Sequence, residues 1–143
     1  MSTHDLPTIR GWWRGADIDE RRALGLSDDA ATAAAHAERG EDRGHLARAL
    51  GHAGVASHPG PDEPEDEAVA QALHRFVGAT PSLLALVQAD DLAGETSAVN
   101  LPGTDRERPN WRRRLSVDAA DLWDTPVGSR AATDLAPDRG TGG

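Results

Sequence analysis

A helix, a turn and a short apolar run follow one another between residues 65 and 87, and this succession constrains the fold more than any other feature of the chain. From residue 65 to residue 77, apolar side chains recur at spacings of three and four, the period of a helix with one buried face. Thr80-Pro81 ends this helix, and residues 83–87 are a continuous apolar run typical of a strand buried on both faces. We therefore predict an α/β fold in which this strand belongs to a parallel sheet.

The N-terminal residues predict a helix that begins next to an acidic side chain. Asp5 is suited to cap a helix that starts at Leu6, and Pro7 then falls in the first turn, where its missing N–H costs no hydrogen bond. We expect this helix to end near Trp13, and a second short helix to cover residues 18–24.

Residues 27–67 favour helix first and a linker after it. The alanine-rich stretch up to about residue 37 has high helix propensity but little to bury. Gly40 and Gly44 are expected to interrupt it before helix resumes over residues 46–53. Residues 55–67 are polar and contain three prolines, so we predict a linker-like insertion there.

The C-terminal third is expected to be mostly irregular. Residues 88–114 form a long polar loop, and loops of this length are usually functional or disordered. A last helix is predicted over residues 117–123, capped by Ser116. Residues 1–127 would then form one unit, and residues 128–143, with little to bury, a disordered tail.

The composition argues against several classes of function. A net charge of −9 is the wrong sign for a nucleic-acid surface. No apolar run approaches the roughly 20 residues of a membrane span, and the N-terminus lacks the layout of a signal peptide, so a soluble cytoplasmic protein is expected. The chain has no cysteine and no phosphate-binding glycine motif, and we expect neither a cofactor nor a metal. Four histidines lack the paired spacing of zinc ligands, namely His36, His45, His52 and His58.

Separated stretches of the chain carry an uncommon combination of residues. Residues 2–13 contain His4-Asp5-Leu-Pro-Thr and then Gly-Trp-Trp, residues 100–104 read Asn-Leu-Pro-Gly-Thr, and residues 110–114 read Asn-Trp-Arg-Arg-Arg. In this combination the chain resembles the 4-α-glucanotransferases, or amylomaltases, of glycoside hydrolase family 77 in the α-amylase clan. The resemblance covers most of residues 1–123 and is loosest over about residues 30–65.

The resemblance implies a fold and a reaction. Such enzymes fold as (β/α)₈ barrels with the active site at the carboxyl ends of the strands, so the chain is expected to be the C-terminal remnant of a TIM barrel, mostly helical with one or two strands. They are similar to retaining glycosidases, in which one carboxylate forms a glycosyl-enzyme and a second carboxyl acts as acid and then as base. A sugar hydroxyl takes the place of water, so α-1,4-glucan segments pass between maltooligosaccharides.

The family's nucleophile and its acid/base both precede the His-Asp segment. The chain is therefore expected to be inactive alone and to need the missing N-terminal part of the same enzyme as its partner. The alternative is a standalone, non-catalytic carbohydrate-binding or scaffold module derived from the same family.

The resemblance implies functional roles for four residues, and three of these roles have a structural alternative. Asp5 would stabilise the positively charged transition state, although the residues alone favour a helix N-cap. His4 would donate a hydrogen bond to a sugar hydroxyl, or be an ordinary partly buried histidine. Asn100 would bind sugar hydroxyls, or be a turn residue before Leu-Pro-Gly. Trp111, in a loop, would stack on a sugar ring.

Two other groups are expected to have structural roles. Trp12 and Trp13 fall in a helix, where tryptophans belong more often to the core than to a sugar site. The basic run at residues 112–114 is expected to pair with acidic residues such as Asp118 and Asp121.

Overall fold

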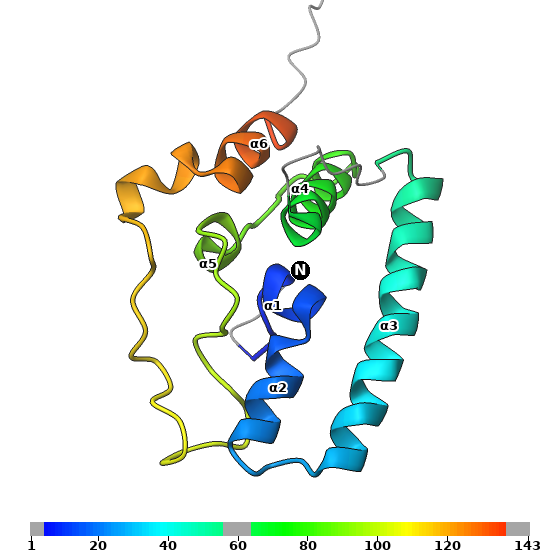
Figure 1. Ribbon diagram of the computed structural model, residues 1–143. Helices are drawn as coiled ribbons and strands as arrows, with labels where there is room; N and C mark the ends of the chain where they lie inside the picture. The colour runs from blue at the N-terminus through cyan, green and yellow to red at the C-terminus, as the bar shows by residue number, and fades with distance from the viewer. Residues whose placement is uncertain (1–4, 56–63, 137–143) are drawn as a thin grey trace, which may run out of the picture.

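The computed structural model describes residues 5–55 and 64–136. Within these two ranges all regular secondary structure is helical, and there is no strand. In chain order the elements are α1 (Ile9–Arg14), α2 (Ala16–Ala23), α3 (Asp29–His52), α4 (Glu65–Gly78), α5 (Ala89–Leu92), the 3-10 helix η1 (Ala119–Asp124) and α6 (Pro126–Asp134). Figure 1 shows α1 and α2 in the middle of the molecule, α3 along one side, and α4, α5 and α6 toward one end.

The first helix begins later than the sequence predicts. The N-cap of α1 is Thr8, whose hydroxyl accepts a hydrogen bond from the Gly11 N–H at 3.0 Å. Asp5 lies in the turn before this helix, so the prediction that Asp5 caps it is wrong. Pro7 explains the difference, because a proline disfavours the helical conformation at the preceding residue, Leu6.

The third helix, α3, runs without a break over 24 residues. Asp28 caps it by accepting a hydrogen bond from the Ala31 N–H at 2.8 Å. The predicted interruption at Gly40 and Gly44 is wrong, because a glycine costs a helix only about 1 kcal/mol and the surrounding alanines favour helix. Leu50 is the one buried residue of this long helix.

The helix predicted over residues 65–77 is confirmed as α4, which packs against α1 and α6. Its buried face joins two apolar clusters, one shared with α5 and α6 and one with the end of α3. The buried members of the two clusters are Ala70, Leu92, Val127 and Ala131, and then Leu50, Val55 and Ala72. The predicted linker over residues 55–67 lies largely outside the described residues, and its last three residues are the first turn of α4.

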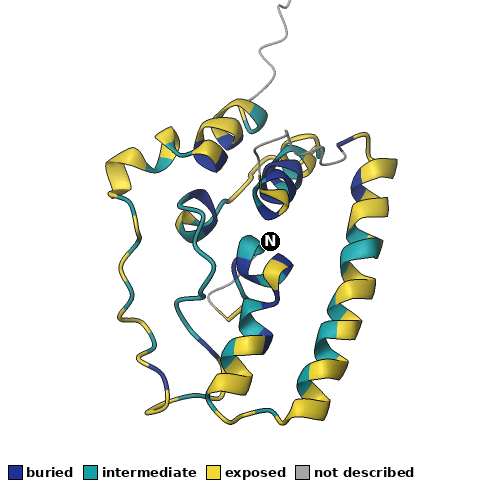
Figure 2. Ribbon diagram, in the orientation of Figure 1, coloured by how far each residue is buried: buried dark blue, intermediate teal, exposed yellow. Residues whose placement is uncertain are grey.

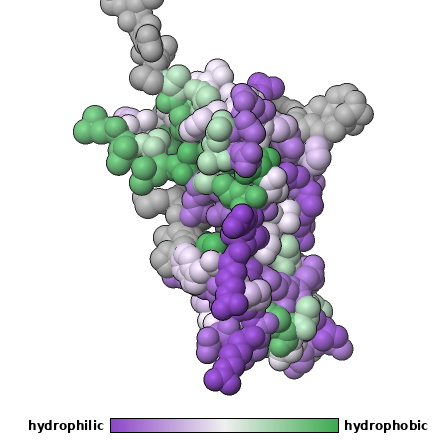
Figure 3. Space-filling view, turned by 90° about the vertical axis from the view of Figure 1, so that its left-hand side faces the viewer, coloured by the Kyte–Doolittle hydropathy of each residue, from purple (hydrophilic) through white to green (hydrophobic). Residues whose placement is uncertain are grey.

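The strand predicted over residues 83–87 is not formed. This segment is an irregular stretch between α4 and α5, and its leucines Leu83, Leu84 and Leu86 are 107%, 72% and 75% exposed. A strand needs a neighbour for its backbone hydrogen bonds, and the described residues contain no second strand to provide one. Hydrophobic surface gathers in the upper half of the view in Figure 3, above a mainly hydrophilic lower half.

Part of the predicted disordered tail is a helix. α6 covers residues 126–134, and Thr125 caps it by accepting from the Gly128 N–H at 2.9 Å. Val127 and Ala131 are buried one turn apart against the rest of the core, which stabilises the helix. The prediction of disorder is therefore wrong for residues 128–134. The helix predicted over 117–123 is replaced by the 3-10 helix η1, with Asp118 rather than Ser116 at its N-cap.

Candidate functional site

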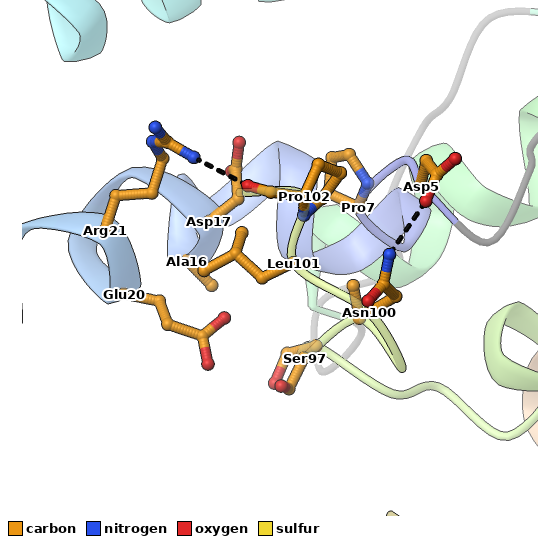
Figure 4. A pocket seen from close by; sticks show the side chains of 12 residues that line it. Asp5, Pro7, Ala16, Asp17, Glu20, Arg21, Ser97, Asn100, Leu101 and Pro102 are labelled. Carbon is orange, nitrogen blue, oxygen red and sulfur yellow. Dashed lines mark hydrogen bonds between the residues drawn. The ribbon is translucent and has the colours of Figure 1, made fainter. Parts of the chain in front are cut away.

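A cavity of about 440 Å³ lies where the turn before α1, the helix α2 and the loop after α5 meet. Figure 4 shows Asp5 and Asn100 together at one end of this cavity and the α2 side chains Glu20 and Arg21 at the other. The lining residues are Asp5, Pro7, Ala16, Asp17, Glu20, Arg21, Thr96, Ser97, Ala98, Asn100, Leu101 and Pro102. Two of the residues selected from the sequence thus line one cavity.

Asp5 and Asn100 are in direct contact although 95 positions separate them in the chain. The Nδ2 of Asn100 donates a hydrogen bond to Oδ1 of Asp5 at 2.8 Å. The contact leaves the second amide hydrogen and the carbonyl oxygen of Asn100 for other partners, because an amide has two donors and an acceptor. A carboxylate and an amide on a cavity wall can bind neighbouring hydroxyls of one ligand.

Trp111 lies in a neighbouring cavity of about 580 Å³ that shares Asn100 with the first. Its side chain is 60% exposed. Its backbone has a φ of 63°, the left-handed region that a bulky residue rarely adopts. A hydrogen bond from the Trp111 N–H to the Val99 oxygen at 3.0 Å accompanies this conformation. The structure therefore brings Trp111 near Asn100 but does not place it in the cavity of Asp5.

Two buried carboxylates hold α1, the helix that follows the turn of Asp5. Asp91 accepts a hydrogen bond from the Ile9 N–H at 2.7 Å; burial raises the pKa of Asp91, and this hydrogen bond opposes the rise. Asp66 accepts from the Nε atoms of Arg10 and Arg14 at 2.6 and 2.9 Å. Burial alone would raise the pKa of Asp66, but the two guanidinium groups hold that pKa below its usual value.

The tryptophans of α1 have their rings against α3. The guanidinium of Arg39 lies 4.8 Å from the ring centroid of Trp12, and that of Arg43 lies 5.6 Å from the ring centroid of Trp13. Trp13 is only 9% exposed. These contacts agree with the prediction that both tryptophans have a structural role.

The remaining predictions from the sequence concern His4, the basic run, a metal site and a membrane span. His4 lies outside the described residues. In the basic run at 112–114, Arg113 pairs with Asp90 and, at 3.0 Å, with Glu95. The prediction that this run pairs with acidic residues is therefore confirmed for Arg113, but its partners are Asp90 and Glu95 rather than Asp118 and Asp121. In the described part of the chain, no group of acidic, histidine or cysteine side chains is arranged to hold a metal ion. No helix there is long and apolar enough to cross a membrane.

Sequence reasoning missed Arg108, which is buried in the loop near Asn100 with 8% of its surface exposed. It also missed Asp66 and Asp91 as buried supports of α1. A charged residue normally predicts an exposed position. No sequence signal distinguished these three charged residues from the exposed charged residues around them.

Comparison with solved structures finds a similar fold within a longer protein. The amylomaltase from Corynebacterium glutamicum superposes with a TM-score of 0.79 and 30% sequence identity, over 94% of this chain and 21% of that one. The fold therefore matches one part of an amylomaltase.

Sequence comparisons agree. Residues 1–119 match the family described as 4-alpha-glucanotransferase. The 4-alpha-glucanotransferase of Mycobacterium bovis is 36% identical over 116 residues, which are 81% of this chain and 16% of that protein. The Haemophilus influenzae enzyme of the same name is 25% identical over 131 residues, covering 86% of this chain and 18% of that protein. The chain belongs to the 4-alpha-glucanotransferase family and spans roughly a sixth of the length of these relatives.

Proposed function

We propose that these residues are the C-terminal portion of a 4-α-glucanotransferase that transfers α-1,4-glucan segments between maltooligosaccharides. The observation that carries the proposal is the contact of Asp5 with Asn100 on the wall of an open cavity. Both residues belong to motifs that resemble the family, and the fold joins them across 95 positions. Membership of the 4-alpha-glucanotransferase family supports the same reaction.

In this proposal the reaction is a retaining double displacement. A carboxylate attacks the anomeric carbon while a carboxylic acid protonates the leaving oxygen, and a glycosyl-enzyme forms. The acid, now a base, then takes the proton of an incoming sugar hydroxyl as that oxygen displaces the enzyme carboxylate. By motif position, the residues that perform these two tasks precede Asp5 and come from the other portion of the enzyme.

Asp5 is the third carboxylate of the mechanism. It accepts hydrogen bonds from ring hydroxyls of the cleaved sugar, and its negative charge stabilises the oxocarbenium-like transition state. Asn100 orients the Asp5 carboxylate and contacts an adjacent hydroxyl with its remaining amide atoms. His4 donates to a hydroxyl of the same sugar. Trp111 offers its exposed indole to a sugar in the neighbouring cavity.

The segment in this proposal is part of a (β/α)₈ barrel. Its exposed leucines Leu83, Leu84 and Leu86 then lie against the remaining portion of the enzyme. Large apolar side chains that are exposed side by side usually mark such a contact.

A graft tests the proposal. Residues 1–143 replace the superposable region of the Corynebacterium glutamicum amylomaltase, and the product is assayed for disproportionation of maltotriose. We expect glucose and longer maltooligosaccharides from the graft and none from residues 1–143 alone. A folded graft without transfer activity would contradict the proposal. Turnover by residues 1–143 alone would contradict it as well. Maltotriose binding by that chain, paired with an inactive folded graft, would favour a non-catalytic carbohydrate-binding module.

A further inference from the structure

Arg108 uses every one of its hydrogen-bond donors inside the protein. Its Nε donates to Oε1 of Glu20 at 2.7 Å. Nη1 donates to the Val99 oxygen at 3.3 Å and to Oδ1 of Asn110 at 2.8 Å, and Nη2 donates to Oγ of Ser97 at 3.0 Å and to the carbonyl oxygen of Ala98. A guanidinium has five N–H donors, so all five have acceptors.

These contacts enclose Asn100 from both sides along the chain. Arg108 holds the three residues immediately before Asn100. Asn110, which Arg108 orients, accepts from the Leu101 N–H at 3.0 Å. The Nδ2 of Asn110 donates to the carbonyl oxygen and the hydroxyl of Thr104 at 3.1 and 2.8 Å. The backbone on either side of Asn100 is thus bound to one pair of side chains, Asn110 and the buried Arg108.

The contact with Glu20 connects this loop to α1 and α2, the two helices that follow the turn of Asp5. Glu20 belongs to α2, which follows α1 after the single residue Gly15. The turn of Asp5 precedes α1 directly. Glu20 also lines the cavity of Asp5. The hydrogen-bonded ion pair between Arg108 and Glu20 therefore helps to hold the loop against the α1–α2 unit, beside the hydrogen bond from Nη1 of Arg10 to the Gly94 oxygen at 3.2 Å.

We propose that Arg108 is a positioning residue that holds Asn100 at hydrogen-bonding distance from Asp5. The structural part of this proposal stands on the contacts alone, whereas its effect on turnover rests on the proposed function. Lysine cannot replace Arg108, because an ammonium has three donors on one atom and cannot span the five acceptors. Arg108 itself touches no reacting atom; it acts through Asn100.

Nuclear magnetic resonance on the 143-residue chain tests the structural part. We compare the wild type with Arg108→Lys and with the matched control Arg130→Lys, an exposed arginine of α6. In Arg108→Lys, the nuclear Overhauser contacts between the Asn100 side-chain amide and Asp5 should vanish. Exchange of the Leu101 and Trp111 amides should accelerate about ten- to hundredfold, as for lost hydrogen bonds. The control should match the wild type.

A folded Arg108→Lys chain that keeps the contacts between Asn100 and Asp5 would overturn the proposal. If Arg108→Lys does not fold, Glu20→Gln provides the test instead. This substitution keeps the shape of the side chain and an acceptor for Arg108 but removes the negative charge. In Glu20→Gln the contacts between Asn100 and Asp5 should weaken while the wild-type helix content remains. Unchanged contacts in that variant would count equally against the proposal.

A double-mutant cycle in the graft tests the effect on turnover. Arg108→Lys should lower kcat about ten- to hundredfold with little change in KM, the scale expected for a misplaced catalytic group. In an Asn100→Ala background, the same substitution should add less than about twofold, because the residue through which it acts is gone. Fully additive effects would show that Arg108 acts elsewhere and would overturn the proposal. An inactive wild-type graft would instead refute the proposed function, and the resonance measurement would still decide the positioning role.

Discussion

The loop of residues 94–114 is irregular but is attached to the rest of the molecule by specific contacts, whereas the helix α3 is regular but makes few such contacts. α3 is 24 residues of regular helix with one buried residue, Leu50. The loop has no helix or strand, yet it contains the buried side chains Leu101 and Arg108. Figure 2 shows α3 largely exposed along its length. Regular secondary structure therefore does not indicate here which part of the chain is held most specifically.

The physical reason lies in where the backbone hydrogen bonds go. The bonds of a helix are satisfied internally, so alanine-rich α3 needs few tertiary contacts to be helical. In the loop the carbonyl groups of Ala98 and Val99 need donors from elsewhere, and Arg108 supplies them. The loop is thus held by specific side chains, and it is the region that lines both cavities.

The largest effect expected from this contrast is on catalysis. In the graft, Asp5→Asn keeps size and an acceptor for Asn100 but removes the negative charge. We expect kcat to fall by about 10² to 10⁴, the scale of losing preorganised electrostatic stabilisation, with little change in KM. Asp42→Asn, the same substitution on the exposed side of α3, is the control and should leave kcat unchanged. Near-normal turnover of Asp5→Asn would remove Asp5 from the mechanism.

The next effect tests whether the loop is seated on α1. A Cβ on Gly11 would collide with the backbone oxygen of Thr96 and lie 2.8 Å from Oγ1 of Thr8. A backbone oxygen cannot move aside as a flexible side chain can, so Gly11→Ala should cost roughly 3 kcal/mol of unfolding free energy, the upper range for overpacking. Urea denaturation of the 143-residue chain measures this. An unchanged midpoint would show that the loop does not rest on this helix.

A third effect is a dependence of stability on pH that originates at α1 rather than α3. Because the folded pKa of Asp66 lies below its unfolded value, its ion pairs with Arg10 and Arg14 stabilise the fold above about pH 4. This stability is lost as the pH falls through the folded pKa. Asp66→Asn should cost about 2 kcal/mol of unfolding free energy at pH 7, as for hydrogen bonds to charged groups. It should also make the stability of the fold fall less steeply at acid pH.

Thermal melts between pH 2 and pH 7 provide the measurement. Asp42→Asn on the exposed side of α3 is the control and should keep the wild-type profile. Asp91 works in the opposite direction, because burial raises its folded pKa and its charged form costs stability as the pH rises. In Asp66→Asn, a decrease of stability with rising pH that originates at Asp91 should therefore remain. If Asp66→Asn leaves the loss of stability at acid pH unchanged, the ion pairs of Asp66 with Arg10 and Arg14 contribute little to stability.

The contrast also explains what could be predicted from the sequence. α4 was predicted to within one residue, because its apolar side chains recur with the period of a helix and most of them pack against neighbouring helices, Phe76 being the exposed exception. Residues 83–87 have an equally apolar sequence, but a strand depends on neighbours, and the described residues supply none. The helix α6 was missed although Val127 and Ala131 stand four positions apart, because its glycine and polar content suggested disorder.

The candidate site was predictable only in part. Motifs that resemble a family led to Asp5 and Asn100, and the structure joins them. The role of Arg108 was not predictable, because nothing in a sequence tells a buried guanidinium from the exposed arginines around it. Burial of a charge depends on acceptors that the fold assembles from separate segments, here from α2 and from two parts of the loop.

The smallest effect is the same glycine substitution made in α3. A Cβ on Gly40 would meet no atom within 4 Å, so Gly40→Ala adds no clash. Alanine restricts the unfolded chain and suits a helix better than glycine, so we expect about 1 kcal/mol of added stability. Urea denaturation should give a higher midpoint with an unchanged slope. The substitutions Gly11→Ala and Gly40→Ala thus have opposite predicted signs, because one helix meets the backbone of a fixed loop and the other faces solvent. A loss of stability in Gly40→Ala would show that α3 is packed against something at this position, and the contrast between the two regions would no longer hold.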